Sequence, residues 1–277
     1  MARRGIRWVA ITAVAAAVIT AAVFAGRAIW QIAVSHLSSN SCSVGDYDID
    51  TSQASVAAAM VAEVTSYRDP LPERAAVLVL AAALQESKLT NLPPHAGDRD
   101  SVGVLQQRPS QGWGGGNAKR LTDVGEATRE FLDALVKIPH WQTRPLAQAV
   151  QAVQISADGS AYAQHEPEAQ ALADALTGRR PAGINCSFQA PTVVAPARTV
   201  AAQARSQLGI DTPVAAGRTV RVPGAGWQTA AWFVANADRL GIDRVSYDRH
   251  VWTRTGGWQR GPASRHAVVA VMATLQG

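Results

Sequence analysis

The chain is most constrained by an unbroken apolar run of ten residues, Ala75 to Leu84. The segment Asp69-Pro70-Leu71-Pro72 ends one helical pattern just before it, and Glu73 falls in the next first turn, where a carboxylate suits the helix dipole. The pattern therefore predicts a helix over residues 73–89. Because apolar residues occupy every side of this helix, it must be buried nearly all round.

Shorter patterns predict further helices around this one. Apolar residues at helical spacing predict helices over residues 52–66, 123–137, 145–156 and 166–177. Between them, residues 90–118 are rich in glycine and proline, and a long loop inside a compact domain is usually functional. After residues 187–200, a helix over 230–240 and strands over 244–247, 250–253 and 267–272 are expected.

The N-terminal end has the composition of a membrane segment. Arg3, Arg4 and Arg7 precede an uncharged run, residues 8–26, that is long enough to cross a bilayer as a helix. Since cytoplasmic flanks carry excess Lys and Arg, everything after residue 37 is expected outside the cytoplasm, in a single-pass cell-membrane protein. A cleaved signal peptide is the alternative.

These patterns together predict a mainly α protein with five segments. They are a cytoplasmic tip and transmembrane anchor over 1–37, a linker over 38–51, a helical domain over 52–186, a second linker over 187–200, and a small α+β module over 201–277. The net charge of +5 favours an anionic neighbour, such as a membrane surface or cell wall. The basic residues form no stripe among aromatics, so no nucleic-acid partner is predicted.

Cysteine and histidine usage limits the chemistry. The two cysteines, Cys42 and Cys186, bracket the helical domain, and outside the cytoplasm such a pair is expected to form a disulfide rather than stay as free thiols. The six histidines fall in no ligand pattern, so no metal and no other cofactor is predicted.

The catalytic candidates follow the apolar helix. Glu86 lies at its end, and apolar surroundings would raise the pKa of its carboxyl, as a proton donor requires. A loop with Asp98 and Asp100 comes next, and either carboxylate could position water or merely cap a turn. The polar and aromatic candidates for sugar contacts, each of which could equally be structural, are Ser87, Ser101, Gln106, Trp113 and Tyr162.

The order Glu86-Ser87, Gly97-Asp98-Arg99-Asp100-Ser101, Gly103-x-x-Gln106 and Gln111-Gly112-Trp113 resembles lytic transglycosylases and goose-type lysozymes, in a membrane-anchored bacterial branch. The resemblance covers roughly residues 50–186. It implies a lysozyme-like domain that binds the glycan strands of peptidoglycan and cleaves the β-1,4 bond between N-acetylmuramic acid and N-acetylglucosamine. Glu86 would be the general acid.

One departure from this family keeps a second function open. Typical transglycosylases carry Ala-Tyr-Asn-Ala-Gly, whereas this chain has Ala161-Tyr162-Ala163. Tyr162 would stand in for the family tyrosine. The alternative is a catalytically degenerate domain that binds wall glycan or scaffolds an envelope complex, and the sequence names no protein partner.

Overall fold

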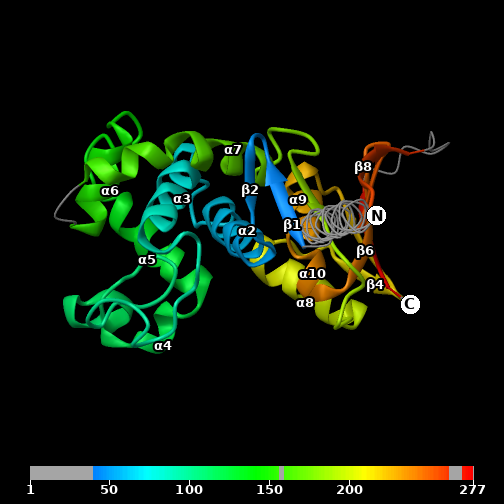
Figure 1. Ribbon diagram of the computed structural model, residues 1–277, viewed down its shortest axis with the longest axis horizontal. Coiled ribbons are helices and arrows are strands. Elements are labelled where there is room, and N and C mark those ends of the chain that lie inside the picture. The colour runs from blue at the N-terminus through cyan, green and yellow to red at the C-terminus, as the bar shows by residue number, and fades with distance from the viewer. Residues whose placement is uncertain (1–39, 156–158, 262–269, 277) are drawn as a thin grey trace, which may run out of the picture. The chain divides into compact units, whose positions relative to one another are not determined.

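The computed structural model describes residues 40–155, 159–261 and 270–276 (Figure 1). The expected membrane span over residues 8–26 and the arginines before it lie outside these residues. Among the helices that are described, none combines the length and apolar character needed to cross a membrane. The described residues from 40 onward belong to one compact unit.

Helix α3 (Arg74–Ser87) occupies the centre of the helical part. Every side chain from Ala75 to Leu84 is buried, as the continuous apolar run requires. The helices that contact α3 are α2 (Thr51–Thr65), α5 (Val124–Leu135), α6 (Leu146–Gln154) and α7 (Glu166–Leu176). The last turn of α3, which carries Glu86, is only half-buried and so places this residue at the edge of the core.

A three-stranded antiparallel sheet joins the two ends of the helical part. Its strands β1 (Ser41–Val44), β2 (Tyr47–Ile49) and β3 (Ile184–Ser187) run in the order β2-β1-β3. Cys42 lies directly opposite Cys186 in the β1–β3 pair, and the two form the expected disulfide. Most of the segment expected to be a linker, residues 38–51, is therefore the β1–β2 hairpin.

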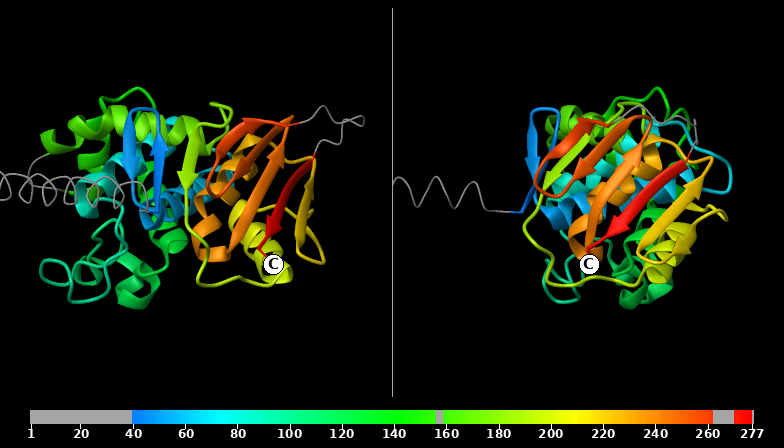
Figure 2. Two further views of the ribbon diagram at one scale, coloured as in Figure 1. Left: turned by 45° about the vertical axis from the view of Figure 1, so that its right-hand side comes forward. Right: turned by 90° about the vertical axis from the view of Figure 1, so that its right-hand side faces the viewer.

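The C-terminal part contains a six-stranded antiparallel sheet of order β4-β5-β9-β6-β7-β8. The strands are β4 (Val214–Ala216), β5 (Thr219–Pro223), β6 (Ile242–Tyr247), β7 (His250–Thr253), β8 (Gly257–Arg260) and β9 (Ala270–Leu275). Helices α8 (Ala197–Leu208) and α9 (Trp227–Ala235) pack against one face of this sheet (Figure 2). Asn236 separates α9 from the short α10 (Ala237–Leu240).

The expected fold class, a mainly α protein with a transmembrane helix and a small α+β module, is wrong. The helical part includes a sheet of its own, and the C-terminal sheet has six strands where three were expected. The unexpected strands of this sheet have three to five residues, and all three residues of β4 are exposed. Alternation is present only in β5, where Val220 and Val222 are buried around Arg221, and so short a pattern is a weak signal.

Buried polar contacts connect the two parts through β3. The indole N–H groups of Trp252 and Trp258 donate to the backbone oxygens of Cys186 and Ile184, at 3.0 and 2.9 Å. Arg254, only 4% exposed, donates to the backbone oxygens of Gln189, Ala237 and Ile242. The buried apolar side chains of both parts accordingly belong to one continuous core.

Candidate functional site

Glu86 lies in the last turn of α3 and faces η3 (Ser160–His165), a 3₁₀ turn that precedes α7. The hydroxyl of Tyr162, a buried residue of η3, donates a hydrogen bond to Glu86 Oε1 at 2.5 Å. Partial burial raises the pKa of the Glu86 carboxyl, and hydrogen bonds from Tyr162 and Gln154 oppose part of this rise. The sequence prediction that Glu86 has apolar surroundings agrees with this position.

Gln154, the last residue of α6, was not among the residues selected from the sequence. Its side chain hydrogen-bonds Glu86, and its Nε2 also donates to the backbone oxygen of Leu105 at 2.9 Å. An amide nitrogen carries two hydrogens, so one glutamine can make both contacts at once. Gln154 thus ties the carboxyl of Glu86 to the loop that contains Gly103 and Gln106. A glutamine at a helix end is too common to have marked this role in the sequence.

Ser87 holds this loop against the end of α3, and Gln106 closes a turn within the loop. The Ser87 hydroxyl donates to the backbone oxygen of Val104 at 2.7 Å, and Gln106 Nε2 folds back onto the backbone oxygen of Gly103 at 2.9 Å. Gly103 has a φ of +79°, and a Cβ on it would lie 2.1 Å from the backbone oxygen of Leu121. The Gly-x-x-Gln segment is therefore a tight turn that only glycine permits at this position.

The surroundings of Asp98 and Asp100, the two loop carboxylates, differ from those of Glu86. Asp100 accepts from Ser110 N at 2.8 Å and from Arg108 Nε at 2.7 Å. These hydrogen bonds hold the pKa of Asp100 well below its usual range. Asp98 is exposed, with Arg99 Nε 3.8 Å from its carboxylate. No hydrogen bond joins either aspartate to Glu86, and Asp100 fixes the start of η1 (Pro109–Gln111) through Ser110 N.

Ser101 and Trp113 occupy structural positions in the same loop region. Ser101 is buried, and its N–H donates to the backbone oxygen of Asp98 at 3.0 Å. Trp113 is the first residue of η2 (Trp113–Gly116), where it is half-buried against the core. No hydrogen bond joins either residue to Glu86.

Gln85 fixes η3 beside α3 and so supports Tyr162. Its Oε1 lies 3.0 Å from His165 Nε2 and 3.2 Å from Gln164 Nε2, both in η3. Burial lowers the pKa of His165, which favours the neutral ring. Because its partner is an amide oxygen, Nε2 is the donor of this hydrogen bond. Gln85, the residue before Glu86, therefore holds η3 in place, and η3 carries Tyr162, which donates the hydrogen bond to Glu86.

Within residues 40–155, 159–261 and 270–276, no cluster of three or more His, Cys, Asp or Glu side chains is placed to hold a metal ion. The chemistry available beside Glu86 is thus that of one carboxyl with a raised pKa, a phenol and an amide. Comparison of the chain with protein-family models gives no match, and comparison with curated proteins gives none.

Proposed function

We propose that this protein cleaves the β-1,4 bond between N-acetylmuramic acid and N-acetylglucosamine in peptidoglycan, with Glu86 as general acid. The observation that carries the proposal is the geometry of Glu86: a half-buried carboxyl of raised pKa, held by Tyr162 and Gln154. Such a carboxyl keeps its proton to higher pH than an exposed glutamate does, and glycoside cleavage needs a proton for the leaving oxygen.

The surroundings of Glu86 favour ring closure over hydrolysis. In the first step Glu86 protonates the glycosidic oxygen and the bond to the muramic acid C1 breaks. In the second, the resulting carboxylate removes the proton from a hydroxyl of the same sugar, whose oxygen bonds to C1 and forms an anhydro ring. Inverting hydrolysis instead needs a second carboxylate to activate water. Arg108 and Ser110 hold the pKa of Asp100 well below its usual range, so Asp100 is a weak base for activating water.

The disulfide supports a location outside the cytoplasm, where thiol pairs persist in the oxidised state. In this proposal the substrate is the wall of the cell that makes the protein.

The test is digestion of purified peptidoglycan followed by mass spectrometry of the soluble products. We expect muropeptides with anhydro ends, and we expect Glu86→Gln to lower the rate by about 100-fold or more, the usual contribution of a general acid. Glu168→Gln is the matched control, because Glu168 is another half-buried glutamate whose pKa burial raises. It should cleave as the parent does.

The outcomes separate the alternatives. Products with reducing ends would contradict ring closure, and an unchanged rate in Glu86→Gln would contradict the assignment of the acid. If the parent protein gives no products but co-sediments with peptidoglycan, the glycan-binding alternative is supported instead.

A further inference from the structure

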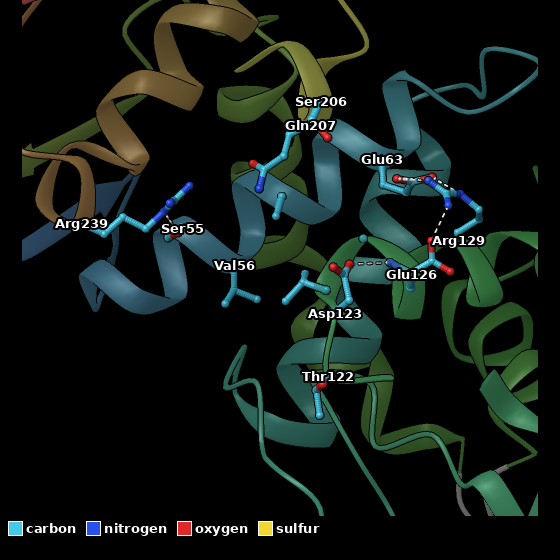
Figure 3. Close-up of a pocket in the computed structure, with 13 residues that line it drawn as sticks. Ser55, Val56, Glu63, Thr122, Asp123, Glu126, Arg129, Ser206, Gln207 and Arg239 are labelled. Carbon is cyan, nitrogen blue, oxygen red and sulfur yellow. Dashed lines mark hydrogen bonds and ion pairs between the residues drawn. The ribbon is translucent and has the colours of Figure 1, made fainter. Parts of the chain in front are cut away.

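A second candidate site lies in a cavity of about 450 Å³ whose lining does not include Glu86 (Figure 3). Four segments that are distant in sequence form it: one side of α2, the start of α5, the end of α8, and Arg239 of α10. This volume is within the range of small-molecule pockets, which often occur where two parts of a protein meet. The cavity is therefore a candidate small-molecule site that is separate from the site at Glu86.

At one side of the cavity, neutral groups fix the guanidinium of Arg239. It donates to Ser55 Oγ at 3.1 Å, Asn236 Oδ1 at 2.7 Å and Gln203 Oε1 at 2.7 Å. Asn236 is itself buried and bonded to the backbone oxygen of Trp232. Among the described residues, no carboxylate lies within ion-pairing distance of Arg239. The guanidinium of Arg239 is therefore held in place by neutral groups, and no carboxylate among the described residues neutralises its charge.

Asp123 contributes a charge of the opposite sign to the same lining. As the N-cap of α5, its Oδ1 accepts from Glu126 N at 3.0 Å, and no cation in the described parts of the chain pairs with it. The cavity's other acids differ, because Arg129 pairs with both Glu63 and Glu126 at 2.7 Å. In Figure 3, this ion-pair cluster and Arg239 lie on opposite sides, with Asp123 between them.

We infer that this cavity binds a small zwitterion, an amino acid or short peptide, with its carboxylate on Arg239 and its ammonium group on Asp123. A preorganised guanidinium suits a carboxylate, and charge-assisted hydrogen bonds are the stronger kind. Ser206 and Gln207 line the cavity and offer polar groups to a peptide backbone, while Val56 and Val124 offer apolar surface. The inference does not depend on the proposed glycan cleavage.

The test is isothermal titration calorimetry of the full-length protein with alanyl-alanine, its N-acetyl derivative and its C-terminal amide. The free dipeptide should bind, and blocking either end should weaken binding about tenfold or more, as loss of a hydrogen bond to a charged group does. Arg239→Gln should remove the difference between the free acid and the amide. Asp123→Asn, which preserves the helix cap, should remove the effect of N-acetylation.

Two further variants keep the result interpretable. Arg244→Gln removes an exposed arginine outside the cavity and should bind like the parent, and Arg239→Lys should keep a preference for the free carboxylate. Thermal unfolding verifies that each variant is folded. The proposal is overturned if no dipeptide binds the parent, if both blocked forms bind as well as the free one, or if folded Arg239→Gln and Asp123→Asn behave like the parent.

Discussion

At the scale of single residues, the pKa of Glu86 is set by opposing effects. Burial disfavours the charged carboxylate, whereas the donors on Tyr162 and Gln154 favour it. Burial is the larger effect. The same two donors also fix the direction of the carboxyl, so changes at these positions should alter both the pH dependence and the rate of any reaction that uses Glu86.

Tyr162→Phe should move the high-pH limb of the pH–rate profile for kcat/KM to higher pH. The change removes a hydrogen bond that lowers the pKa of Glu86, so the acid stays protonated to higher pH. Tyr67→Phe is the matched control, because Tyr67 is also buried and donates to a carboxylate, that of Asp133 at 2.5 Å. Its profile should coincide with that of the parent. A limb that stays in place or moves to lower pH in Tyr162→Phe would contradict the assignment.

Glu86→Gln should stabilise the protein, and only at higher pH. Since folding raises the pKa of Glu86, its contribution to stability is fully present below the pKa of the unfolded chain and is lost as pH rises through the folded value. Glutamine stays neutral throughout. Thermal unfolding should therefore show a higher Tm for the variant at pH 8 than for the parent, and little difference at pH 4. A change of about 1 kcal/mol corresponds to roughly 2–4 °C. Equal differences at both pH values would refute this linkage.

The sequence made Glu86 recognisable but not the side chains that hold it. Glu86 follows an apolar run and precedes a distinctive loop, so the local sequence pattern was enough to select it as a candidate. Gln154 lies 68 positions later and has ordinary neighbours; only the packing of α6 against α3 brings it to the carboxyl. Ser87 and Gln106 were selected as sugar contacts, yet Ser87 bonds the backbone oxygen of Val104 and Gln106 bonds that of Gly103.

At the scale of elements, the turn around Gly103 allows a controlled comparison of two glycines. Gly103 and Gly116 have nearly the same φ, +79° and +81°, but a Cβ would collide with Leu121 O only at Gly103 and would meet nothing within 4 Å at Gly116. Both alanine variants carry left-handed strain, so their difference isolates the collision. We expect Gly103→Ala to lower the free energy of unfolding by roughly 1–3 kcal/mol more than Gly116→Ala does. Urea denaturation measures it, and equal losses would contradict the close approach.

Elements were predictable where the apolar pattern was long and regular. The helix over 73–89 was expected from its continuous apolar run and the proline-containing segment before it, and the helix over 123–137 from apolar residues at helical spacing. The expected helix over 230–240 is broken at Asn236, whose buried side chain bonds the backbone oxygen of Trp232. The hairpin over 41–49 resembled a linker because its strands are short and many of its residues are small and polar. Its pairing with β3, which is remote in sequence, is not visible in the local pattern.

At the scale of the whole molecule, the buried side chain of Arg254 joins backbone segments that are distant in sequence. It joins the backbone at Gln189, Ala237 and Ile242 and pairs with Asp238 at 3.2 Å. Arg254→Met should lower the free energy of unfolding by about 3 kcal/mol or more, because buried carbonyls and a carboxylate lose their partner. Arg244→Met, at an exposed arginine nearby, should stay within about 0.5 kcal/mol of the parent.

Urea denaturation followed by both tryptophan fluorescence and far-UV circular dichroism measures this effect. The two signals should coincide in the parent, because one continuous core spans the helical and C-terminal parts. A cost for Arg254→Met no larger than that for Arg244→Met would show that the contacts of Arg254 with these segments do not stabilise the fold.

The disulfide also determines how the molecule would carry a mechanical load. A pull between residues 40 and 276 enters at β1, crosses from Cys42 to Cys186 through the covalent bond, and continues into the C-terminal part. The chain from 43 to 185 is a closed loop outside this line of tension. It includes Glu86, Tyr162 and Gln154, so a pull between residues 40 and 276 would load the C-terminal sheet and leave the candidate active site unloaded.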